Sequence, residues 1–166
     1  MIAHTEAGIF TQLEKILHDF TLELNLNASA RNKKPLKIKE ILDDKRLVMS
    51  LIRNGLPHSV YTLIESLAPF SESDWASYFG ISTKSLQRYK KAGERFKPVH
   101  SEKIMEMAEV IYLGLTLFGS AEKFNSWLNQ PSLALGGEKP LDLLKDSYGK
   151  SLVTGELTRM NHGIFV

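Results

Sequence analysis

The chain has 166 residues, a net charge of +2 and no cysteine. This length suggests one domain or two small ones, and the lack of cysteine excludes disulfides, thiolate catalysis and cysteine-ligated metal sites. No apolar run approaches the roughly 18 residues that span a bilayer, and no secretory signal pattern is present. We therefore expect a cytoplasmic protein that does not enter a membrane.

Hydrophobic residues along the chain recur at helical spacing, and no segment shows a convincing strand pattern. The polar stretch 25–37 is expected to be a linker or an exposed arm, and the apolar run Leu47–Met49 leaves a strand possible inside the second helix. The fold class is therefore expected to be all-α. Helices are predicted, in chain order, over residues 4–24, 38–53, 59–68, 71–79, 82–91, 101–118, 121–129, 140–144 and 152–160.

Serine and glycine residues predict where several of these helices begin and end. Ser59, after the break at Gly55-Leu56-Pro57, and Ser101 are each expected to cap the helix that follows. Gly149 is expected to break the chain again, and Gly155 to weaken the last helix. The helix that ends near residue 118 is apolar on nearly every side in its second half, so it should be central or lie at a subunit interface.

Residues 73–89 have the spacing of a helix-turn-helix. Ala76 supplies a small side chain where two short helices would cross, and Gly80, four residues later, suits the left-handed backbone position of a turn. Ser82 is a good N-cap for the second helix. The small core between the two helices is expected to consist of Trp75, Phe79, Ile81, Leu86 and Tyr89.

Basic and polar residues recur at i, i+3, i+4 and i+7 on the second of these helices, so they share one side. Arginine and glutamine pair with guanine and adenine edges, lysine reaches guanine or phosphate, and the helix N-terminus with its hydroxyls holds phosphate. This pattern predicts DNA binding by two copies in a symmetric dimer, with a merely structural helical hairpin as the alternative. The predicted DNA-binding residues are Ser82, Thr83, Lys84, Ser85, Gln87, Arg88 and Lys91.

The C-terminal region combines aromatic residues, a tight turn and an apolar chain end. Phe124, Trp127 and Leu128 lie on one helical face, where they would anchor either the core or a partner. Gly136-Gly137 fits a tight turn, because the dinucleotide and P-loop patterns are both absent. The apolar ending Ile164–Val166 is compatible with either a frayed end or a docked one.

In this region the chain resembles the MbcA/ParS/Xre antitoxins, the partners of RES-domain toxins. The likeness covers roughly Leu51 to Phe165, and two positions depart from the family: Ser132, where asparagine is frequent, and Asn161, where an acidic residue is common. The first 36 residues have no counterpart. The most specific motifs are Trp127-Leu128, Leu135-Gly136-Gly137, Pro140-Leu141-Asp142-Leu143-Leu144 and the ending Arg159 to Phe165.

The resemblance implies an antitoxin that neutralises a cognate RES-domain, NAD-directed toxin and represses its own operon. The implied partners are that toxin, operator DNA and a second copy of the chain in a homodimer; the chain itself is expected to be no enzyme and to need no cofactor or metal. In the family the chain end lies near the active-site cleft of the toxin, which favours a docked tail here. The implied toxin-binding residues are Trp127, Leu135, Pro140, Leu141, Leu144, Arg159, His162, Gly163, Ile164, Phe165 and Val166.

Three regions are expected: an N-terminal helix and linker (1–36), a helix-turn-helix DNA-binding and dimerisation domain (37–119), and a helical C-terminal toxin-binding domain (120–166). Two other functions remain open. One is a stand-alone helix-turn-helix transcription regulator without a toxin. The other is a toxin-binding scaffold that does not bind DNA.

Overall fold

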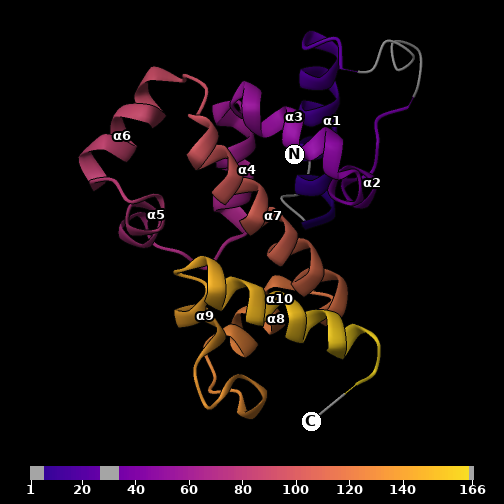
Figure 1. Ribbon diagram of the computed structural model, residues 1–166, viewed down its shortest axis with the longest axis vertical. Helices are drawn as coiled ribbons and strands as arrows, with labels where there is room; N and C mark the ends of the chain where they lie inside the picture. Colours follow the sequence, from indigo (N-terminus) through magenta and orange to yellow (C-terminus); the bar gives the residue numbers. More distant parts are fainter. Residues whose placement is uncertain (1–5, 27–33, 165–166) are drawn as a thin grey trace.

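The computed structural model describes residues 6–26 and 34–164, and over these residues the chain contains helices and no strand (Figure 1). The predicted all-α fold is therefore confirmed. The predictions for residues 1–5, 27–33, 165 and 166 lie outside the described residues. The elements are α1 (Glu6–Glu23), α2 (Ile38–Asp43), α3 (Lys45–Asn54), α4 (His58–Leu67), α5 (Glu72–Phe79), α6 (Thr83–Ala92), α7 (Pro98–Phe118), α8 (Ala121–Leu128), the 3-10 turn η2 (Leu133–Leu135), α9 (Pro140–Leu143) and α10 (Ser147–Asn161).

Helix α7 is the central element of the fold, as its apolar sequence predicts. It packs against α3, α4, α8 and α10, and it buries Ile104, Met107 and Ile111 completely. One continuous apolar core includes residues from α1 through α10. In the described part of the chain no single helix is long and apolar enough to span a membrane. Helices α7 and α8 together reach the required length and apolar composition, but a bend of 110° separates them.

The segment 38–53 forms two helices where one was predicted. The break falls at Asp44, whose carboxylate Oδ1 accepts hydrogen bonds from the backbone N–H groups of Arg46 (3.1 Å) and Leu47 (3.0 Å). This side chain caps α3 and so starts a new helix one residue after α2 ends. The strand left open at this position is excluded, because these residues lie in α3.

Two predicted caps are wrong. Helix α4 begins at His58 with Pro57 at the N-cap position, so Ser59 lies inside the helix. Helix α7 begins at Pro98, and Ser101 is fully buried within it. The Ser101 hydroxyl instead bridges two chain segments: it accepts from the backbone N–H of Leu56 (2.9 Å) and donates to the carbonyl of Phe96 (3.2 Å).

The predicted break at Gly149 is also wrong, because this residue lies in the first turn of α10. Asp146 caps the helix by accepting a hydrogen bond from the Gly149 N–H at 2.7 Å. A Cβ atom at position 149 would collide with the backbone carbonyl of Leu143. Glycine is therefore required here for the close approach of α9 and α10, not for a turn.

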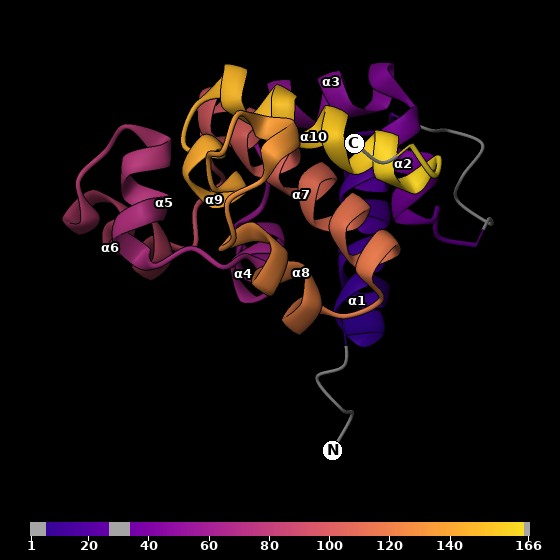
Figure 2. The ribbon, with the colours of Figure 1, turned by 90° about the horizontal axis from the view of Figure 1, so that it is seen from below.

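Helices α5 and α6 lie at one end of the molecule, and the C-terminal end of α10 lies at the other. Figure 1 and the perpendicular view in Figure 2 agree on this separation. Helices α8 and α10 both pack on α7, and α9 and η2 pack on α10. The fold thus separates α6 from the C-terminal end of α10, whereas α9 lies near α5.

Candidate nucleic-acid interface and C-terminal domain

The turn between α5 and α6 has the local geometry that its sequence predicts. Gly80 ends α5 in the left-handed region with φ of 70°, and the N–H of Ile81 donates to the carbonyl of Ala76 at 3.0 Å. The hydroxyl of Ser82 then accepts from the N–H of Ser85 at 3.1 Å and caps α6. The predictions for Ala76 as a buried small residue, Gly80 and Ser82 are confirmed.

An aromatic cluster behind this turn fixes the two helices on the rest of the fold. Trp75 and Leu86 are fully buried and Phe79 is buried, as predicted, whereas Ile81 and Tyr89 are only partly buried. Two further fully buried members, Tyr61 and Phe96, were missed by the sequence analysis. The ring centroid of Tyr61 lies 5.2 Å from that of Trp75 and 5.1 Å from that of Phe96, and the centroids of Phe79 and Phe96 lie 5.8 Å apart.

Two histidines border this cluster in apolar surroundings. Burial lowers the pKa of His100, and the nearby Lys97 and Lys103 lower it further. Burial also lowers the pKa of His58, whose ring stacks on Phe96. Both side chains therefore favour the neutral form in the folded protein.

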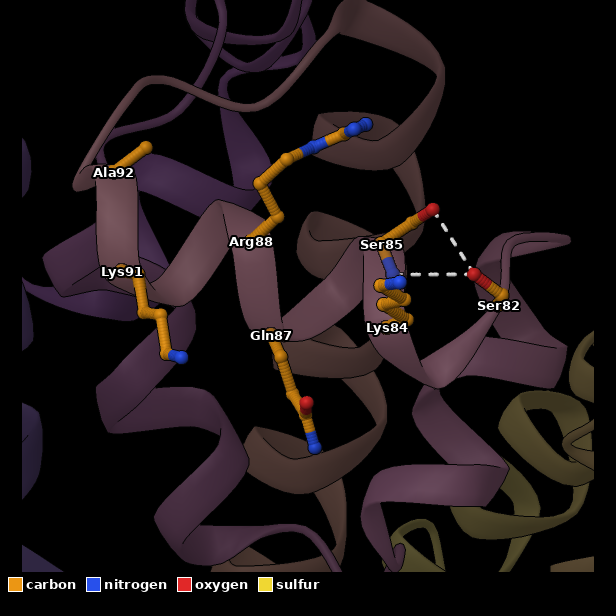
Figure 3. A pocket seen from close by; sticks show the side chains of 7 residues that line it. All are labelled: Ser82, Lys84, Ser85, Gln87, Arg88, Lys91 and Ala92. Carbon is orange, nitrogen blue, oxygen red and sulfur yellow. Dashed lines mark hydrogen bonds between the residues drawn. The ribbon is translucent and has the colours of Figure 1, made fainter.

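The outer side of α6 is exposed and carries the predicted basic and polar stripe (Figure 3). The cations Lys84, Arg88 and Lys91 form no ion pair with any other described residue. Ser82 and Ser85 lie at the start of the same surface and are hydrogen-bonded to each other at 3.0 Å. We call this surface the α6 face; its residues are Ser82, Lys84, Ser85, Gln87, Arg88, Lys91 and Ala92.

One member of the α6 face is tied to α5. Gln87 donates a hydrogen bond from Nε2 to Oε1 of Glu72 at 2.8 Å. Lys90, on the inner side of α6, pairs with Glu65 at 2.6 Å and with Glu72 at 3.6 Å. Sequence reasoning missed Glu72, because only the folded structure brings the start of α5 beside the middle of α6.

Several residues predicted to contact a toxin are instead buried inside the C-terminal region. Leu144 is fully buried, and Leu135 and Pro140 are also buried, so all three pack the domain and do not form its surface. Trp127 is partly buried, with its ring centroid 5.6 Å from that of Phe118. Apolar residues enter a protein's own core by default, and a sequence motif does not distinguish this from a contact with a partner.

The other predicted contacts lie on the surface where the structure describes them. Leu141 is partly exposed, and Arg159, His162, Gly163 and Ile164 are exposed. Arg159 forms an ion pair with the buried carboxylate of Glu156. Gly163 has φ of 74° and follows the end of α10. Phe165 and Val166 lie outside the described residues.

The described residues gather no group of three or more side chains that could hold a metal ion. The features that the structure does present are an exposed basic helix after a glycine turn and a compact helical unit at the C-terminal end.

Comparison with known proteins finds similarity to antitoxins. Residues 113–163 match the family model of the antitoxin Xre/MbcA/ParS C-terminal toxin-binding domain. The chain is 28% identical over 120 residues to Antitoxin Xre of Yersinia enterocolitica, which covers 72% of this chain and 81% of that protein. It is also 42% identical over 48 residues to the Prs ADP-ribosylating antitoxin of a Sphingobium strain, covering 29% of this chain and 30% of that protein.

Residues 113–163 thus resemble the toxin-binding domain of the Xre/MbcA/ParS antitoxins, as the C-terminal motifs predicted, and the similar proteins are themselves antitoxins. The matching family model describes a toxin-binding domain, and the similar protein over most of the chain is an antitoxin, in keeping with the expectation that the chain is not an enzyme.

Proposed function

We propose that this antitoxin neutralises a RES-domain, NAD-directed toxin through its C-terminal region and represses its own operon by binding DNA through α6. The match of residues 113–163 to a toxin-binding domain and the similarity to an antitoxin support the first part. The α6 face supports the second, and it is the observation on which the DNA-binding proposal rests. The chain end after α10 and the exposed side of α6 lie far apart on the molecule.

The charge of the α6 face suits a duplex. Its three exposed cations have no internal carboxylate partner among the described residues, so they can exchange counterions for phosphate groups without first breaking an ion pair. Ser82 and Ser85, at the N-terminal end of the helix, lie where hydroxyls and backbone N–H groups bind phosphate in other proteins. Gln87 and Arg88 are the residues best suited to read base edges.

One copy of α6 offers little contact area, so we propose that the chain binds DNA as a homodimer. In a two-fold dimer the recognition helices would enter successive major grooves, about 34–36 Å apart or a multiple of that distance. The operator is then expected to contain two related half-sites. Sedimentation of the purified chain, alone and with operator DNA, measures the stoichiometry directly.

For toxin neutralisation, we propose that the chain end from Arg159 onward reaches the active-site cleft of the toxin. Arg159, His162 and Ile164 are exposed at the end of α10, where they can contact a partner. Deleting residues 159–166 should leave DNA binding largely intact and should reduce neutralisation. Full protection by the truncated chain would contradict this role for the tail.

Two experiments separate this proposal from its alternatives. A gel-shift assay uses the DNA upstream of the gene, and co-purification uses the RES-domain product of the adjacent reading frame as the probe. Binding to both is the expected result. Toxin binding without DNA binding would indicate a scaffold, and DNA binding without a neighbouring toxin would indicate a stand-alone regulator.

A further inference from the structure

Helix α10 carries a continuous stripe of exposed residues along its outer side. Their spacing of four, three, four and three residues places them on one face of the helix. Tyr148 and Leu152 are large apolar side chains, and yet 87% and 58% of their surfaces are exposed. We call this surface the α10 stripe; its residues are Tyr148, Leu152, Gly155, Arg159 and His162.

The orientation of the stripe is fixed by the opposite side of the same helix. Val153 and Leu157 are fully buried there, and Gly149 makes its close approach to α9. Helix α10 packs against α7 and α9, so the stripe faces away from the body of the chain. Leu133, in the turn η2 that packs on α10, is also exposed, to 93% of its surface.

Gly155 is the informative member of the stripe. Glycine is among the least favourable residues in a helix interior, and here the backbone is helical and does not require it. A Cβ atom at this position would meet no atom within 4 Å, in contrast to Gly149 on the same helix. Nothing within the described chain therefore explains the absence of a side chain at position 155.

A small residue between exposed apolar anchors lets another backbone approach closely. We infer that the α10 stripe is the surface on which the toxin docks, with Gly155 at the closest approach. This inference rests on the proposed neutralisation of a toxin and deepens it. Tyr148 and Leu152 insert as apolar anchors, and Arg159 and His162 donate hydrogen bonds at the edge nearest the chain end.

Two observations favour the toxin as the occupant over DNA or a second copy. The toxin-binding family model covers residues 113–163 and therefore the whole stripe. An aromatic residue, a leucine and one arginine also form the composition of a protein interface, whereas a DNA-binding surface needs a denser array of cations. The stripe leads directly to Ile164, so it continues into the tail proposed to enter the toxin's cleft.

The test compares three single variants of the full chain, using the co-expressed RES-domain protein as the probe. Gly155→Ala is expected to raise the melting temperature of the free antitoxin by about 2–4 °C, because alanine favours the helix. The same variant should weaken toxin binding by about tenfold or more. Leu152→Asp should weaken it by about 100-fold, and Thr158→Ala, an exposed position beside the stripe, by less than about twofold.

The Gly155→Ala variant separates an interface from a folding effect, since it makes the free chain more stable while it makes the complex weaker. Toxin binding at wild-type affinity by both Gly155→Ala and Leu152→Asp would overturn the inference and leave the proposed function standing. A change in the oligomeric mass of the free chain with unchanged toxin affinity would overturn it in favour of a second copy. If the wild-type chain fails to bind the RES-domain protein, the proposed function and this inference both fail.

Discussion

The α6 face and the C-terminal region differ in how their sequence relates to their surface. On α6, all the predicted DNA-binding residues are exposed or partly exposed at the start and along one side of a helix. In the C-terminal region, the motif residues Leu135, Pro140 and Leu144 are buried, and the exposed apolar residues Tyr148 and Leu152 lie outside those motifs.

The difference follows from the chemistry of the side chains. Lysine and arginine are almost never fully buried without a partner, so a basic stripe at helical spacing predicts a surface directly. An apolar motif marks either a core or an interface, and only the fold decides between them. Family motifs rich in leucine and proline therefore identify a domain more securely than they identify its contacts.

The largest expected effect tests the distinction between core and surface. Leu144→Ala should lower the free energy of unfolding by about 2–5 kcal/mol, because it opens a cavity at a fully buried position. Leu133→Ala, at a 93% exposed position, should change it by less than about 0.5 kcal/mol. Urea denaturation monitored by circular dichroism measures both. Similar losses in the two variants would contradict the assignment of the motif to the core.

A second prediction concerns the α6 face alone. Lys84→Ala and Arg88→Ala should each weaken operator binding by about 5- to 100-fold, or about 1–3 kcal/mol, and each lost phosphate contact should reduce the salt slope by about 0.9. The control is Lys123→Ala, an exposed lysine on α8. If the α6 variants bound operator DNA with unchanged affinity and unchanged salt dependence, the DNA-binding surface would have to lie elsewhere on the protein.

A third prediction tests how much the N-cap of α6 contributes to the stability of the protein. Ser82→Ala removes the N-cap of α6 and should lower the free energy of unfolding by about 1 kcal/mol. Ser77→Ala, at an exposed position within α5, is the matched control and should have little effect. Thermal and urea unfolding of both variants give the comparison. If Ser77→Ala lowered the free energy of unfolding as much as Ser82→Ala, the N-cap would have no particular contribution to stability.

The smallest expected effect is a dependence of the free energy of unfolding on pH, to which His100 at the start of α7 contributes. Burial lowers the pKa of His100, so the unfolded chain takes up a proton at a higher pH than the folded chain. The free energy of unfolding should therefore fall as pH is lowered below about 6.5, and level off below the folded-state pKa. His100→Phe should reduce this dependence, with the contribution of His58 remaining. Urea titration at several pH values measures it, and an unchanged slope would contradict the prediction.

Much of the fold was predictable because its signals are local. Helical spacing located the helices, and Gly80 and Ser82 fixed the turn before α6 through conformational and capping preferences that act over a few residues. The features that were missed depend on contacts between distant segments. Ser101 joins Leu56 to Phe96, and Gly149 accommodates the carbonyl of Leu143.

The candidate sites were predictable to different extents for the same reason. The α6 face required only the period of one helix, whereas the hydrogen bond between Gln87 and Glu72 required the crossing of two. Gly155 was read from the sequence only as a weakness in a helix. In the structure Gly155 lies on the outer side of α10, where a Cβ atom would meet no neighbour, and this suggests a role in binding a partner.

The central claim is that one chain carries two separate binding surfaces, and a crossed comparison tests it most directly. The affinities of the Lys84→Ala/Arg88→Ala double variant and of Leu152→Asp are measured for operator DNA and for the RES-domain toxin. We predict that the first variant has a reduced affinity for DNA and an unchanged affinity for the toxin. The second variant should have a reduced affinity for the toxin and an unchanged affinity for DNA. Loss of both ligands by either variant, at an unchanged free energy of unfolding, would contradict the account.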